Sequence, residues 1–222
     1  MIQVQLGLFI RFAKEITTSS LSQKILHELG GFPLKTADEE GVRLKLPAEK
    51  LSIIWTSNGC SIRSENLKDA QSSSTTILNT LSAINELVVF DQLSDRRLGT
   101  CWILPMSKYT LKELEQLYRQ EMMTKHSNYD GVYDSSVILD IKREGKILHH
   151  QSGPMDYKQL KRDYLRYELK DVPQAFLFLE ASVSDSKTVK YSFDNMRSFM
   201  LDSFSCCESH SKEFESIWGG RL

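Results

Sequence analysis

The sequence lacks a long apolar run, an excess of charge of one sign and a framework of paired cysteines. No apolar stretch approaches the roughly 20 residues that a helix needs to cross a bilayer, so we expect no membrane association. Lysine and arginine total 28 against 29 acidic residues, and this balance excludes a chain that is basic overall, leaving room only for a local basic patch. The four cysteines form no Cys-x-x-Cys or disulfide pattern, which indicates reduced thiols in the cytoplasm.

Sequence motifs of cofactor-dependent enzymes are missing too. The chain has no Gly-x-Gly-x-x-Gly, Walker or other glycine-rich phosphate loop, so we expect no nucleotide cofactor. No signature of a catalytic cysteine surrounds any of the four thiols. We therefore predict no catalytic residues, no cofactor and no bound metal, and our first interpretation is a protein without enzymatic activity.

What the sequence does contain is a β-hairpin signature in each half. Residues 51–64 hold two apolar segments around Asn58-Gly59, a dipeptide that favours positive φ at both turn positions. Residues 136–149 hold two more around Glu144-Gly145. Apolar residues at helical spacing occur over residues 66–87, 110–125 and 194–218. The pattern predicts an α+β fold of two sheet-and-helix halves, each with an antiparallel hairpin, and such halves can take a ferredoxin-like form.

A polar, turn-rich segment over residues 125–131 separates these halves. We place the boundary near residue 128. This gives an N-terminal α+β half over residues 1–127 and a C-terminal α+β half over residues 128–222 that ends in an amphipathic helix. The first twelve residues alternate between apolar and polar and lack the basic region and cleavage site of a signal peptide, so they predict a first strand.

Cysteine and histidine residues offer a weak metal-binding pattern in the terminal helix. Cys206 and His210 lie one helical turn apart, with Cys207 beside them, but a structural zinc site needs four ligands. A packed thiol and an exposed histidine explain the same residues, so no metal site is predicted. Adjacent strand residues face opposite ways, so His149 and His150 should be one exposed and one packed.

The carboxylates of the second hairpin suggest an alternative function, that of a metal-dependent nuclease or hydrolase. Asp134, Asp140 and Glu144, followed by Lys146, resemble the Asp…Glu-x-Lys spacing that holds a divalent ion in such enzymes. Glu144 lies in the turn, however, and Asp134 and Asp140 are separated by about 20 Å along one strand. Solvated turn residues explain the pattern more simply.

Basic residues near aromatic ones suggest another alternative function, that of a nucleic-acid-binding module. Arginines and lysines interleaved with tyrosines can bind phosphates while bases stack on the rings. Acidic neighbours such as Asp163 and Glu168 dilute one of the two groups, and a solvated helix face explains that group more simply. The predicted nucleic-acid-binding residues are Arg96, Arg97, Lys158, Lys161, Arg162 and Arg166.

The terminal helix carries an aromatic stripe at helical spacing. Phe204, Phe214 and Trp218 either pack on the protein's own sheet or form a partner surface. We interpret the stripe as a partner surface of a non-catalytic cytoplasmic interaction or accessory protein. Its partner would be another protein or a second copy of the chain.

Five short landmarks follow one another along the chain. They are residues 4–12, the tryptophan hairpin at 53–59, Asp95-Arg-Arg-Leu-Gly-Thr100, residues 137–141 and the helix end at 214–218. Their order resembles an uncharacterised, sporadically distributed prokaryotic protein family of unknown function, although Pro105 and Met106 stand where that family has an asparagine. The resemblance spans nearly the whole chain and implies no catalytic residues. The setting we expect is an accessory role in prokaryotic defence or a toxin–antitoxin system.

Overall fold

The computed structural model describes residues 1–16, 27–28, 32–33, 42–65, 70–122, 135–143 and 146–220. The longer strands are β1 (Ile2–Phe12), β3 (Val42–Leu46), β4 (Leu51–Thr56), β5 (Gly59–Ser64), β6 (Gln92–Pro105), β7 (Val137–Arg143), β8 (Lys146–Met155) and β9 (Phe176–Asp185). Two short strands are β2 (Phe32–Pro33) and β10 (Val189–Lys190). The helices are α2 (Ala70–Val88), α3 (Leu111–Met122), α4 (Tyr157–Asp163) and α5 (Phe193–Gly219). None of the described helices is long and apolar enough to span a membrane.

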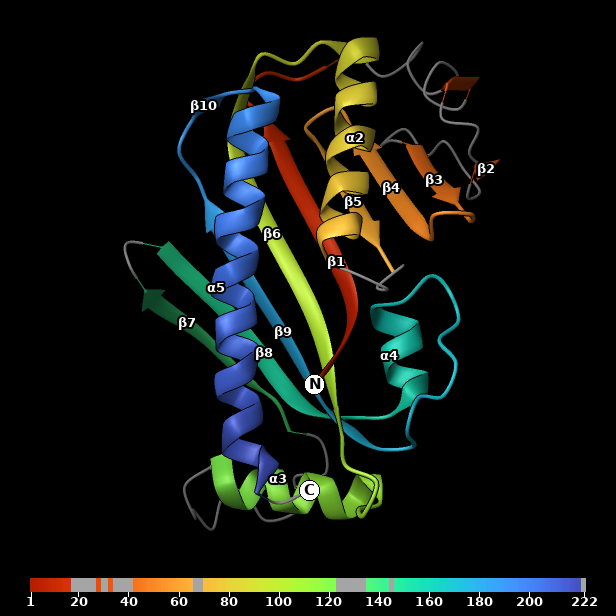
Figure 1. Cartoon of the computed structure of the whole chain (residues 1–222), viewed down its shortest axis with the longest axis vertical. Helices are drawn as coiled ribbons and strands as arrows, with labels where there is room; N and C mark the ends of the chain where they lie inside the picture. The colour runs from red at the N-terminus through yellow and green to blue at the C-terminus, as the bar shows by residue number, and fades with distance from the viewer. Residues whose placement is uncertain are drawn as a thin grey trace.

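All of the strands belong to one antiparallel sheet, which confirms the α+β class (Figure 1). Its order is β2-β3-β4-β5-β1-β6-β9-β8-β7, and β10 pairs with β6 off this path. The predicted first strand is confirmed as β1, and it lies in the middle of the sheet between β5 and β6.

The sheet runs without interruption from the first part of the chain into the second. Strand β6 pairs with β1 on one side and with β9 on the other. The predicted boundary near residue 128 lies outside the described residues. No separate ferredoxin-like sheet is evident in the part of the chain that the structure describes.

Both predicted hairpins form, but the first turns one residue earlier than predicted. Ser57 and Asn58 make the turn, while Gly59 begins β5 and pairs with Thr56. A Cβ atom at Gly59 would lie 2.4 Å from the carbonyl oxygen of Ile10. The glycine is therefore required by the close approach of β1 and not by the turn. In the second hairpin β7 pairs with β8, and the turn residues 144–145 lie outside the described ones.

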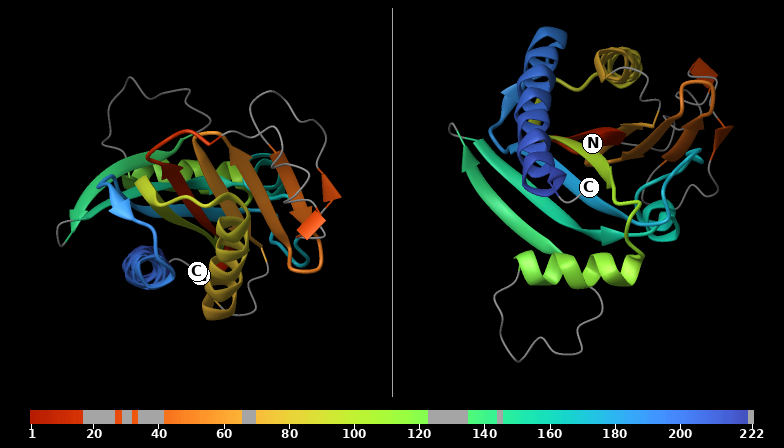
Figure 2. Two further views of the ribbon diagram at one scale, coloured as in Figure 1. Left: turned by 90° about the horizontal axis from the view of Figure 1, so that it is seen from above. Right: turned by 60° about the horizontal axis from the view of Figure 1, so that its bottom comes forward.

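One face of the sheet, here called the helix face, packs against α2, α5 and α3. Figure 2 shows α2 and α5 side by side on this face, and α3 runs across its lower end near the end of α5 (Figure 1). Apolar residues of β1, β4, β5 and α2 form a large core with Met196, Phe199 and Met200 of α5. A second core joins β8, β9 and α3 to Phe214 and Trp218.

The opposite face, here called the open face, is covered only at its lower end. There Leu160 of α4 and Leu165 just after it pack on Cys101, Phe176 and Phe178. Asp156 caps α4 by accepting a hydrogen bond from the backbone N–H of Gln159. Above α4, no described helix lies on the open face, and exposed strand side chains such as Arg11 and Arg43 meet solvent there.

Candidate functional site

The two adjacent arginines predicted to bind nucleic acid lie on opposite faces of the sheet. Arg96 is on the helix face, with its guanidinium carbon 4.4 Å from the centre of the Phe199 ring. Arg97 is on the open face, where its Nε donates to Ser182 Oγ at 2.8 Å. Successive strand residues alternate between faces, so these two side chains cannot line one surface.

The other four predicted basic residues lie on α4 and the loop after it, on the open-face side. Lys161 pairs with Glu168 at 2.7 Å, and Arg162 pairs with its neighbour Asp163 at the same distance. Lys158 and Arg166 are exposed. The structure thus places this group on the same side as Arg97 and away from Arg96.

The aromatic stripe of α5 packs inside the protein. Phe214 and Trp218 are buried in the second core, and Phe204 is half-buried against the first. The Trp218 ring stacks on Tyr118 of α3, with 5.5 Å between ring centres and 9° between planes. Sheet and helix packing therefore uses most of the surface that a partner would need.

The proposed metal ligands do not come together in the described part of the chain. Asp134 and Glu144 lie outside the described residues, and the exposed Asp140 pairs with His149 at 2.9 Å. No cluster of three or more potential metal ligands occurs among the described residues. The prediction that His210 is exposed is wrong, because it turns inward to meet His150.

A chain of buried polar groups links β8 to α5 and α3. His150 Nδ1 lies 2.7 Å from His210 Nε2, and His150 Nε2 lies 2.6 Å from Ser152 Oγ. The Ser152 hydroxyl also lies 2.8 Å from the hydroxyl of Tyr118. As predicted, one histidine of the adjacent pair is packed, namely His150, while His149 is half-exposed. Burial and the neighbouring His210 lower the pKa of His150 to about 4.

The serine–histidine contact resembles a nucleophile–base pair, but its setting is structural. A catalytic hydroxyl must be reached by substrate, whereas Ser152 is completely buried between the sheet and the helices. The hydroxyl is also shared with Tyr118, whose own pKa burial raises to about 12. This network gives buried polar groups their hydrogen-bond partners and joins β8, α5 and α3.

The open face brings together residues that are far apart in the sequence. One row of cross-strand partners crosses it through Ser52, Arg63, Gly7, Gly99, Ser182 and His149. In the next row Phe9 pairs with Ser61 on one side and with Arg97 on the other. Phe9 is partly exposed, so an aromatic ring lies beside an arginine at the middle of the face.

Strand alternation puts five basic side chains on β1, β3, β5 and β6 of the open face. They are Arg11, Arg43, Lys45, Arg63 and Arg97. Asp95 shares this region, and Glu180 of β9 lies 3.4 Å from an Arg97 nitrogen. The Arg97 side chain keeps 41% of its surface exposed, so the pairing with Glu180 leaves it accessible. This part of the face therefore carries positive charge although the whole chain does not.

Two glycines leave the centre of the open face without side chains. Gly7 of β1 and Gly99 of β6 are direct cross-strand partners, and we call them the glycine floor. A Cβ atom built at Gly99 would meet only the Ser182 side chain, at 3.4 Å, and one at Gly7 would meet Arg63 Cγ at 3.4 Å. These are ordinary contact distances, so packing within the protein does not require glycine at either position.

Of this site, the sequence reasoning identified only Arg97. Arg43 and Arg63 alternate with apolar residues in their strands, and that alternation is the one local signal they carry. Their convergence with Arg97 depends on β5 pairing with β1 and β1 with β6.

No family model matches this chain, and the search of curated proteins finds no match. The resemblance drawn from the five landmarks therefore stays a prediction, and any function has to be argued from the geometry.

Proposed function

We propose that this protein is a non-catalytic binding module whose open face holds single-stranded nucleic acid. The proposal rests on the glycine floor, with Arg63 beside Gly7 in the same row and Phe9 and Arg97 paired in the adjoining row. Each part matches one component of a strand of nucleic acid. Arginines bind phosphates, an exposed aromatic ring stacks on a base, and bare backbone lets the chain approach the sheet.

The dimensions of the face suit a short single strand. Five neighbouring strands, from β3 to β6, span about 19 Å at about 4.8 Å between strands. Such a width holds a few nucleotides laid across the strands. Duplex would have to present unstacked bases to Phe9, which base pairing prevents, so single strands are favoured.

The glycine floor favours a binding role over a structural one. Glycine inside a strand costs stability, roughly 0.5–1 kcal/mol relative to alanine. Neither position has a positive φ or a neighbour that excludes a Cβ atom. Because packing does not explain this loss of stability, we infer that the bare backbone serves the close approach of a ligand to the sheet.

The Arg63→Gln/Arg97→Gln double variant tests the proposal directly. We expect it to bind fluorescent oligo(dT) or oligo(rU) at least about tenfold more weakly, and the slope of log K against log salt to become shallower by about 1.4. Fluorescence anisotropy over a salt series measures both quantities, and a duplex of equal length should bind worse than either single strand.

The matched control removes two positive charges from the opposite side of the protein. Arg197 and Lys212 are exposed on α5, so Arg197→Gln/Lys212→Gln changes the net charge equally but leaves the open face intact. Equal loss of binding in both variants would indicate non-specific charge attraction. Unchanged binding in the open-face variant would refute the proposal.

Gly7→Ala separates the binding role of the glycine floor from its effect on stability. Because the new methyl fits beside Arg63, we expect the free energy of unfolding to stay constant or to rise by up to about 1 kcal/mol. Binding of oligo(dT) should weaken, because the methyl stands on the bare backbone. Gly59→Ala is the contrasting control and should destabilise, since its Cβ atom would collide with Ile10. Urea unfolding measures the change in stability, and fluorescence anisotropy on the same samples measures the change in binding.

The strand order also supports the division of the chain into two sheet-and-helix parts. On one side of the β1–β6 pair the order is β5, β4, β3, and on the other it is β9, β8, β7. Each run consists of strands consecutive in the chain and is followed by a long helix, α2 or α5. We propose that the two parts meet at β1–β6, where the glycine floor lies.

A protein partner is the second candidate, and exposed apolar residues at the sheet margin favour it. Ile138 and Leu139 of β7 and Ile147 of β8 are exposed by 59%, 46% and 54%. β7 is the last strand in the sheet order, and exposed edges attract further strands. Such a contact would fit the interaction or accessory role suggested by the sequence. An Ile138→Lys variant that loses self-association in sedimentation experiments would support it.

A further inference from the structure

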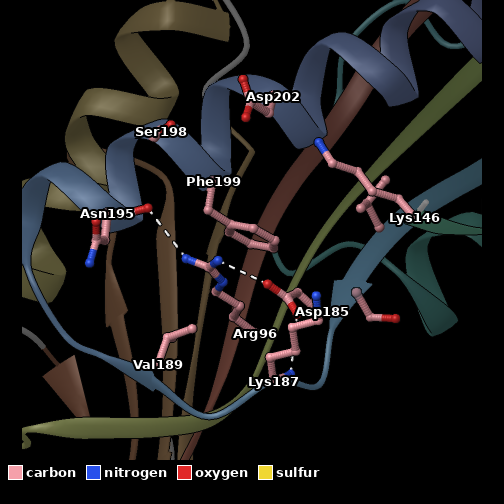
Figure 3. A pocket seen from close by; sticks show the side chains of 11 residues that line it. Arg96, Lys146, Asp185, Lys187, Val189, Asn195, Ser198, Phe199 and Asp202 are labelled. Atoms are coloured by element: carbon pink, nitrogen blue, oxygen red, sulfur yellow. Dashed lines mark hydrogen bonds and ion pairs between the residues drawn. The ribbon is translucent and has the colours of Figure 1, made fainter. Parts of the chain in front are cut away.

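A cavity of about 440 Å³ lies on the helix face, on the other side of the sheet from the glycine floor (Figure 3). It is open to solvent and is lined by β6, the end of β9, the β9–β10 turn and the first turns of α5, with Lys146 of β8 at its side. Pockets that hold small molecules measure about 300–1,000 Å³, so this volume suits a compact ligand. The nucleic-acid proposal makes no use of this cavity.

Arg96 forms a fixed part of the cavity wall. Its Nη2 donates to Asp185 Oδ2 at 2.9 Å, and its Nη1 donates to the Asn195 carbonyl at 3.4 Å. Its guanidinium also lies over the Phe199 ring, and Figure 3 shows it between Phe199 and Asp185. Both terminal nitrogens of this arginine therefore already have partners within the protein, one a carboxylate and the other a backbone carbonyl.

Two lysines on the cavity wall can offer their ammonium groups to a ligand. Lys146 comes from the start of β8 and Lys187 from the β9–β10 turn. Neither ammonium group makes an ion pair within the described part of the chain. Asp185 is satisfied by Arg96 and by the backbone N–H of Lys187, which leaves Asp202 as the other carboxylate on the wall. An anion is the ligand that these lysines favour.

The chemistry of the wall favours phosphate over carboxylate. Carboxylates are held best by the two-pronged fork of arginine, and the two terminal nitrogens of Arg96 already donate to Asp185 and to the Asn195 carbonyl, whereas lysine binds phosphate as a point charge. The first turns of α5 form one side of the cavity, and the positive end of a long helix dipole adds to the attraction. Val183 and Val189 supply an apolar wall for a carbon skeleton.

We propose that this cavity binds a small organic phosphate no larger than a mononucleotide. Lys146 and Lys187 supply positive charge on two sides of the cavity for the phosphate, and Val189 contacts the organic part. The Ser198 hydroxyl on the wall can donate a hydrogen bond, and Asp202 can accept one from a ligand hydroxyl.

Isothermal titration of the full chain with adenosine monophosphate, inorganic phosphate and adenosine tests the proposal. We expect the monophosphate to bind, inorganic phosphate to bind more weakly, and adenosine to show no binding in the same range. The Lys146→Gln/Lys187→Gln variant should bind the monophosphate at least tenfold more weakly. Lys190→Gln, an exposed neighbour that does not line the cavity, should bind it normally.

Several outcomes would overturn the proposal. They are no binding of the monophosphate at millimolar concentration, equal binding by the lysine variant and wild type, or equal affinity for inorganic phosphate and the monophosphate. The Arg63→Gln/Arg97→Gln variant separates this site from the open face. It should keep its affinity for the monophosphate, while the lysine variant keeps its affinity for oligo(dT).

Discussion

Replacing Trp218 by alanine should lower the free energy of unfolding by about 3–5 kcal/mol, the range for large aromatic residues in a core. Trp218 is buried between α5 and α3, where it stacks on Tyr118 and lies near Phe214. The ring belongs to a core that also includes strand residues of the sheet, so its neighbours can close only part of the cavity that its loss would leave. Urea unfolding followed by circular dichroism measures the change.

The neighbouring residue on the same helix provides the control. Ile217 is 65% exposed, so Ile217→Ala should change stability by no more than about 0.5 kcal/mol. A Trp218→Ala protein as stable as wild type would contradict the packing described above. Trp218 would then again be a candidate for the partner surface that the aromatic stripe predicted.

Local patterns in the sequence were sufficient to predict most of the elements. β1 follows from strict alternation, and both hairpins follow from paired apolar segments around a turn. The start of α3 is also local, as the capping-box pattern predicts: the Glu113 carboxylate accepts from the backbone N–H of Thr110, and the backbone N–H of Glu113 donates to the Thr110 hydroxyl oxygen. Each of these features depends on residues within a few positions of one another.

The candidate site could not be predicted in the same way, because it forms by long-range pairing. Gly7 and Gly99 become partners only when β1 joins β6, and Arg63 joins them only through β5. His150 and His210 meet across the sheet–helix interface although 60 residues separate them. No spacing rule within either segment indicates such contacts.

The separation of Arg96 from Arg97 depends on where β6 begins. The apolar pattern predicts a strand over residues 98–106 with the two arginines before it, whereas β6 begins at Gln92 and includes both of them. Because consecutive strand residues face opposite ways, the earlier start of β6 puts the two side chains on opposite faces of the sheet. Their separation gives the protein two distinct basic regions, one on each face.

Acid should destabilise this protein through His150 before most carboxylates are protonated. Burial, then the neighbouring His210 and His149, lower the pKa of His150 from 6.5 to about 4 in the folded protein. The His150 ring faces Ser152 on its own strand and His210 and Phe214 on α5. Ser152 in turn connects the ring to Tyr118 on α3. The Glu213 carboxylate lies 3.8 Å from Nδ1 of His210, the nitrogen that does not face His150.

The sign of the effect follows from the lowered pKa. Between pH 6.5 and about 4 the unfolded chain takes up a proton at His150 that the folded protein does not, so stability falls as the pH falls through this window. The loss amounts to about 2 kcal/mol at pH 5 relative to pH 7.5, and it reaches about 3 kcal/mol below pH 4.

The His150→Gln variant should remove this dependence. Its amide can still hydrogen-bond to Ser152 and His210, but it cannot be protonated in the unfolded chain. Urea unfolding at pH 7.5 and pH 5 should therefore show a drop in stability about 2 kcal/mol smaller than in wild type. His149→Gln, which changes the half-exposed neighbour on the open face, should keep most of the wild-type drop. If His150→Gln loses as much stability on acidification as wild type, the buried pair is not the source of acid sensitivity, and the carboxylates must account for it.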